Sequence, residues 1–72
     1  MIEPTQEFIK KAVENHFDVS EVDTGLVKMK FYFEDQDFKE KFVRLTQELE
    51  TNNLLCTIEK EGYRNMVVVS KL

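Results

Sequence analysis

This 72-residue sequence has few of the residues that staple small proteins or build active sites. It contains one cysteine, one histidine, two glycines and no tryptophan. A lone cysteine cannot close a disulfide within the chain, and no Cys/His spacing typical of a zinc site is present. Stability must therefore come from packed apolar side chains, which make up 42% of the residues and include six phenylalanines.

A basic excess and long apolar runs are also missing. The 14 acidic residues outnumber the 10 basic ones, and the net charge is −4, whereas domains that bind nucleic acid usually carry a basic face. No apolar run approaches the roughly 18 residues of a membrane-spanning helix, and the N-terminus has no signal-peptide pattern. We therefore expect no nucleic-acid partner and no transmembrane segment. The unpaired cysteine suits a reducing compartment, so we expect a cytoplasmic location.

Two segments have the apolar spacing of amphipathic helices. The first is predicted over residues 4–16, because proline is tolerated in a first helical turn. The second is predicted to begin at an Asp37/Glu40 capping box, with Asp35 as an alternative cap. It is predicted to end at residues 52–53, where asparagine accepts a left-handed conformation. The two apolar stripes are Phe8, Ile9, Ala12, Val13 and Phe17, and Phe38, Phe42, Leu45 and Leu49.

Four further segments are predicted to be strands. Glycine-containing turns at residues 23–25 and 60–63 join them as two hairpins. The last strand is ambiguous, because residues 66–69 are all apolar: either both of its faces are buried, or one is an apolar patch for a partner. The predicted strands span residues 17–22, 26–33, 54–59 and 64–71. In the second, Val27, Met29, Phe31 and Phe33 lie on one face and Lys28, Lys30 and Tyr32 on the other.

The predicted order of elements is α-β-β-α-β-β over a single domain of residues 1–72. Two hairpins and two amphipathic helices favour an α+β fold, a two-layer sandwich with both helices packed on one face of one mostly antiparallel sheet. No linker or internal repeat interrupts the pattern.

No group of residues predicts a catalytic or metal site. His16 ends the first helix, where a cation complements the helix dipole. Cys56 alternates with Leu54 and Ile58 in a strand, and we interpret it as a small core residue. The acidic run at residues 34–37 lacks the glycine and the distal glutamate of a calcium loop, so helix capping explains it better. We therefore predict no catalytic, cofactor-binding or metal-binding residue in this chain.

A family resemblance covers nearly the whole chain. The segment from His16 to Val22, an acidic-Gly turn, the sequence Lys30-Phe31-Tyr32-Phe33, the helix from Phe38 and the closing hairpin follow one another in order. Together they resemble the soluble segment that precedes the membrane helices of archaeal site-2-protease-type zinc metalloproteases. The His-Glu-x-x-His zinc motif of that family is absent here, so no catalytic residue can be carried over.

The resemblance implies a non-catalytic N-terminal accessory domain with a docking or regulatory role, at the cytoplasmic face of the membrane. The zinc and the peptide-bond hydrolysis would belong to another part of such a protein, and the partner would be that part or its substrate. The alternative is a stand-alone α+β module that binds a protein or a small ligand. The sequence leaves the oligomeric state open. The predicted contact surface consists of Leu55, Val67, Val69 and Tyr32.

Overall fold

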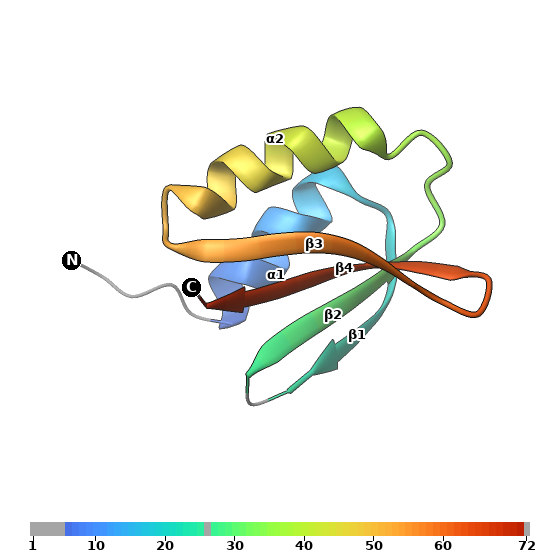
Figure 1. Ribbon diagram of the computed structural model, residues 1–72, viewed down its shortest axis with the longest axis horizontal. Helices are drawn as coiled ribbons and strands as arrows, with labels where there is room; N and C mark the ends of the chain where they lie inside the picture. Colours follow the sequence, from blue (N-terminus) through green and yellow to red (C-terminus); the bar gives the residue numbers. More distant parts are fainter. Residues whose placement is uncertain (1–5, 26, 72) are drawn as a thin grey trace.

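A computed structural model describes residues 6–25 and 27–71 and confirms the α+β fold. The elements occur in the predicted order, and the helices lie together over the sheet (Figure 1). The predicted helix start at Pro4 and strand start at Leu26 lie outside the described residues. The elements are α1 (Gln6–His16), β1 (Val19–Thr24), β2 (Lys28–Phe33), α2 (Lys39–Glu50), β3 (Leu54–Glu61) and β4 (Arg64–Lys71).

The four strands form one antiparallel sheet in the order β1-β2-β4-β3. The last strand of the sequence is thus inserted between β2 and β3, which both run antiparallel to it and therefore parallel to each other. Helix α2 connects these two strands, one on each side of β4. Strands β1 and β3 are left at the two edges of the sheet.

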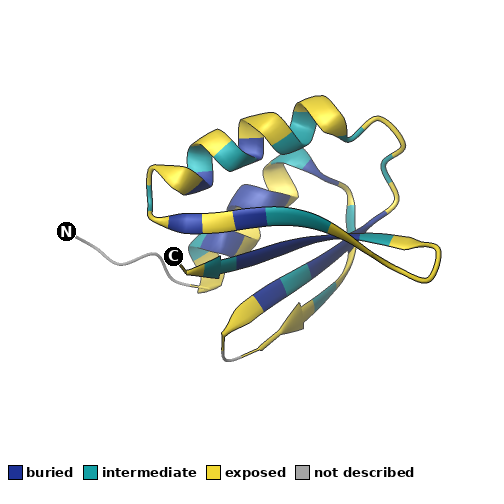
Figure 2. Ribbon diagram, in the orientation of Figure 1, coloured by how far each residue is buried: buried dark blue, intermediate teal, exposed yellow. Residues whose placement is uncertain are grey.

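Both helices pack on the same face of the sheet and form one core with it. The predicted apolar stripes are confirmed, since Val13 of α1 and Leu45 and Leu49 of α2 are fully buried. The two central strands beneath them, β2 and β4, carry most of the buried strand residues (Figure 2). The strand residues of this core are Met29, Phe31, Phe33, Leu54, Cys56, Val67 and Val69.

Strand β4 is buried on both faces, which resolves the ambiguity of residues 66–69. Val67 and Val69 face the helices, whereas Met66 and Val68 face the opposite side with Tyr32 and are still only 6% and 4% exposed. No helix among the described residues covers that side. Long side chains of the sheet itself contribute to burial there: the guanidinium of Arg64, at the start of β4, lies over the Tyr32 ring.

This arrangement corrects the predicted contact surface. Val67 and Val69 are 0% and 1% exposed and belong to the core, so they cannot serve as an accessible surface. Leu55 is 45% exposed but lies on the other face of the sheet, because it pairs with Ser70 rather than with a core residue of β4. The prediction failed because four consecutive apolar residues carry no period from which to choose a face.

The predicted capping box of α2 is also wrong. The N-cap residue is Phe38, and no side chain caps the helix. Asp35 instead accepts a 2.9 Å hydrogen bond from the Asp18 backbone N–H and an ion pair from Lys41. Its carboxylate therefore ties the loop before α2 to the chain leading into β1. At the other end of α2, Asn53 has a φ of 60°, as predicted for the left-handed position.

The first hairpin is shifted from its predicted bounds. Phe17 is not a strand residue: its N–H bonds to the Val13 carbonyl, and its ring packs 4.7 Å from that of Phe33. Strand β1 consequently starts at Val19. Val27 is 80% exposed outside β2, although it continues the alternation of that strand in the sequence.

Replacing Val67 by lysine should prevent folding. The substitution would place an unpaired ammonium in a site with no solvent exposure, at a cost above about 4 kcal/mol, which a small domain does not survive. Leu55→Lys is the matched control and should change the unfolding free energy by about 1 kcal/mol or less. Circular dichroism and urea denaturation distinguish the two, and a well-folded Val67→Lys protein would contradict the packing.

Asp35 should make folding stability depend on acid pH. Burial favours the neutral carboxyl, but the Lys41 ammonium and the Asp18 N–H outweigh this and lower the pKa of Asp35 below its usual value near 3.8. A lowered folded-state pKa stabilises the protein above the unfolded-state pKa, and this contribution is lost as pH falls through the folded value. Asp35→Asn should therefore lower the urea midpoint at pH 7 and match the wild type near pH 2. Asp37→Asn, at an exposed neighbouring carboxylate, is the matched control and should leave the urea midpoint at pH 7 nearly unchanged.

Candidate protein-interaction surface

The single histidine has a structural partner. His16 Nε2 lies 2.9 Å from Glu48 Oε2 and joins the end of α1 to α2. The contact is made across 32 positions of the chain. This pair holds the two helices together. Among the described residues, no nucleophile forms a hydrogen bond with the His16 ring.

The single cysteine is a core residue, as predicted. Cys56 is 6% exposed, and burial raises the pKa of its thiol to about 11, with a small opposing effect from the neighbouring Thr46 hydroxyl. At neutral pH the group is therefore a thiol, which is a poor nucleophile and a poor metal ligand. Within residues 6–25 and 27–71, no cluster of three or more His, Cys, Asp or Glu side chains is suited to hold a metal ion.

Tyr32 belongs to a closed network on the helix-free face. Its hydroxyl donates a 2.5 Å hydrogen bond to Glu61 Oε2, and the Arg64 guanidinium lies 4.0 Å from its ring centroid. Arg64 also reaches Glu21 Oε1 at 3.3 Å. The hydrogen bond to Glu61, followed by burial, raises the pKa of Tyr32. The tyrosine predicted as a contact residue is thus 6% exposed and covered by a charged layer.

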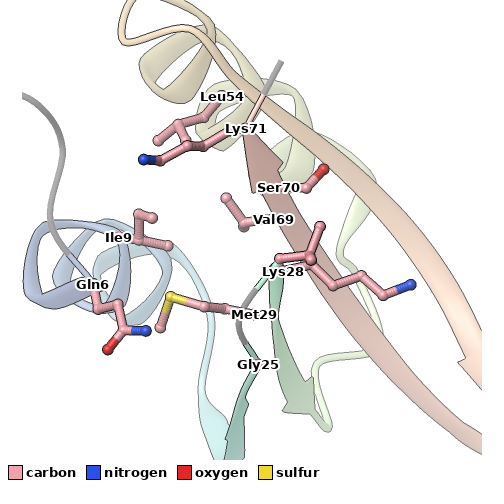
Figure 3. A pocket seen from close by; sticks show the side chains of 10 residues that line it. Gln6, Ile9, Gly25, Lys28, Met29, Leu54, Val69, Ser70 and Lys71 are labelled. Atoms are coloured by element: carbon pink, nitrogen blue, oxygen red, sulfur yellow. The ribbon is translucent and has the colours of Figure 1, made fainter.

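A cavity of about 440 Å³ opens at one end of the core (Figure 3). Its inner wall consists of apolar core residues such as Ile9, Met29 and Val69, while the Lys28 and Ser70 side chains project away to the other side of the sheet. Lys71 and Gln6 supply polar groups at its mouth. Among the described residues, no acid or histidine lines it, and the one lining hydroxyl, that of Ser70, points away, so these residues offer no convergent groups for catalysis.

The two edges of the sheet differ in how they are protected. Strand β1 has an irregular register between Val19 and Glu21 and carries two acidic residues, both of which discourage pairing with another strand. Strand β3 pairs with β4 in unbroken register from Leu54 to Glu61 and contains no proline. Its charged residues are confined to the last three positions. The β3 edge is therefore open to strand addition.

The backbone groups available at this edge follow from the hairpin. A two-residue loop, in which Gly62 has a φ of +65°, joins the register partners Glu61 and Arg64. In such a hairpin the flanking pair exchanges both hydrogen bonds, and bonded and non-bonded pairs then alternate. The N–H and C=O groups of Cys56, Ile58 and Lys60 therefore point away from β4. No backbone hydrogen bond found in the described residues joins them to another segment.

Exposed apolar side chains lie on both sides of the β3 edge. Leu55 projects from the helix-free face and is 45% exposed. On the other face, Glu48 of α2 points toward α1, whereas Thr46 lies against Cys56 of β3. Val43, one turn before Thr46 on that same side, is 54% exposed. The unpaired backbone groups of β3 thus have one exposed aliphatic residue on each face of the sheet, Val43 on the helix side and Leu55 on the helix-free side.

Sequence reasoning identified only part of this surface. Of the four predicted contact residues, Leu55 lies at the β3 edge, and Val67 and Val69 are in the core. Tyr32 is buried beneath the charged side chains of Glu61 and Arg64. Val43 was missed. The available signal was that Val43 is apolar but falls outside the stripe that α2 buries, a position where a helix usually carries a polar residue.

Comparison with known proteins returned no match: no protein-family model, no curated protein and no solved structure matches this chain. Among the described helices, neither is long and apolar enough to cross a membrane.

Proposed function

We propose that this chain is a non-catalytic protein-interaction domain that receives an extended strand along the edge of β3. The observation that carries the proposal is the unprotected β3 ladder with Val43 and Leu55 exposed on its two sides. The titratable groups that sequence analysis singled out support a non-catalytic role, because His16, Cys56 and Asp35 are each engaged in packing or pairing within the fold.

Strand addition accounts for the geometry of this edge. An incoming strand would form main-chain hydrogen bonds with Cys56, Ile58 and Lys60, which supply affinity without regard to sequence. Its side chains would alternate between the two faces of the extended sheet. One set would contact Val43 and the half-buried Ile58, and the other would contact Leu55, so an alternating apolar pattern fits best.

Charge restricts the incoming strand further. Glu59 and Glu61 are exposed on the helix-free face toward the end of β3, whereas Leu55 lies at its beginning. Like charges placed directly opposite each other destabilise a sheet. The strand that binds should therefore avoid acidic residues opposite Glu59.

The resemblance to site-2-protease-type zinc metalloproteases stays a prediction within this proposal. It would make the domain a docking or regulatory part of such an enzyme, with zinc and catalysis elsewhere, rather than a stand-alone binding module. The reading frame that encodes the chain tests this idea. Continuation into apolar spans with a His-Glu-x-x-His motif would support it, and a frame without them would refute it.

Peptides selected for binding should map to β3. A random peptide library displayed on phage and selected against the immobilised protein should yield alternating apolar sequences. In NMR titrations these peptides should shift and protect the amides of Cys56, Ile58 and Lys60 more than those of Thr57 and Glu59. Val43→Lys and Leu55→Lys should each weaken binding at least about tenfold, since they place a charge beside the added strand.

The matched control for these variants is Val27→Lys, the same kind of substitution at an exposed valine away from β3. It should leave peptide affinity unchanged. Failure to select any peptide, or binding at the cavity or at the exposed Tyr63 tip, would overturn the proposal.

A further inference from the structure

We infer that the strand added to β3 is β3 of a second copy of this chain, paired antiparallel about a twofold axis at Thr57. The inference rests on the proposed function and names its partner. The resulting dimer would have one continuous sheet, with α2 of each copy on the same face beside the seam.

The charges of β3 select the register. A twofold axis normal to the sheet can lie at any residue of the strand, but axes at Glu59 or Lys60 place a charged side chain opposite itself. An axis at Ile58 puts the two Glu59 carboxylates on diagonal positions about 7–8 Å apart. An axis at Cys56 shortens the pairing to residues 54–58, because Asn53 has already left the extended conformation. The axis at Thr57 pairs residues 54–60 and separates the Glu59 side chains further.

In the Thr57 register no two like charges lie opposite each other on either face, and each Leu55 lies opposite Glu59 of the other copy. On the helix-free face Thr57 lies opposite its own symmetry mate, and Thr–Thr pairs are favourable across antiparallel strands. On the helix side Cys56 lies opposite Ile58. Both of these residues direct their N–H and C=O groups out of the sheet, so they exchange main-chain hydrogen bonds with each other across the seam.

Helix α2 is placed to reinforce the same axis. It runs antiparallel to β3 (Figure 1), and Thr46 lies against Cys56. With about 1.5 Å of rise per helix residue and about 3.3 Å per strand residue, Val43 lies over residues 57–58. The two Val43 side chains would therefore face each other close to the axis, which explains why an apolar residue occupies this exposed position.

Two charged residues complete the helix contact. Lys39 and Glu50 lie on the same side of α2 as Val43, near its two ends, and both are exposed without an ion-pair partner among the described residues. A twofold axis near the middle of α2 brings each Lys39 close to Glu50 of the other copy. The seam is thus apolar at its centre and oppositely charged at its ends.

Helix spacing permits this packing. Four strands about 4.8 Å apart form a sheet that is wider than a pair of helices packed about 10 Å apart. When the helix pair is centred on the sheet, the axis of α2 lies about 2 Å inward of β3. Extending the sheet across the seam then separates the two copies of α2 by about 9 Å, an ordinary distance for packed helices.

Two variants that place opposite charges at position 57 test the inference. Sedimentation equilibrium should give the wild type twice the chain mass of 8.6 kDa. Thr57→Lys and Thr57→Glu should each dissociate at least about tenfold more readily, because like charges meet at the axis. An equimolar mixture of the two should restore the dimer, which also shows that both variants fold.

The control and the contrary outcomes are distinct. Val27→Lys should leave the dimer intact, whereas Val43→Lys should weaken it. A wild type at single-chain mass into the millimolar range, a dimer that both Thr57 variants retain, or a mixture that stays monomeric would each overturn the inference. If the protein is monomeric yet selected peptides still map to β3, only the identity of the partner is wrong. If neither pairing occurs at β3, the proposed function fails as well.

Discussion

Burial of β4 on both of its faces is the constraint on which the rest of this structure depends. Val67 and Val69 are covered by the helices, and Met66 and Val68 by Tyr32 and the long side chains around it. A strand with this composition is stable only inside a sheet, where neighbours on both sides shield it. Its insertion between β2 and β3 satisfies this need, and it leaves β1 and β3 as the edges.

A chain of this size hides only about 60% of its extended surface when it folds, so its stability needs every contact that its side chains can make. The polar groups that look reactive in the sequence are used to hold elements together. His16 joins the helices, Asp35 anchors the loop before α2, and the Tyr32 hydroxyl binds the β3–β4 hairpin through Glu61. Backbone N–H and C=O groups along the outer edge of β3 stay unpaired among the described residues. This edge has no bulge, and its charged residues lie only at the end of the strand. This is why we propose that the domain binds its partner through that backbone.

The two edges illustrate how local sequence can regulate association. Strand β1 is short, irregular and acidic, and the Asp35 contact holds the segment just before it. Strand β3 is longer and regular, with Leu55 exposed beside it and Val43 above it. An edge so composed, in a protein with net charge −4, confines pairing to one side of the molecule and to partners with a matching pattern.

The sequence by itself determined the elements whose information is local. The stripe from Phe38 to Leu49, the alternation of Met29, Phe31 and Phe33, and the left-handed Asn53 all follow from periods or residue types within a few positions. Tertiary structure alone decided what depends on partners far apart in the chain. These are the strand order, the faces of residues 66–69, the pairing of His16 with Glu48, and the use of Asp35 as an anchor rather than a cap. The open β3 edge is of this second kind, because a strand is at an edge only relative to the strands beside it.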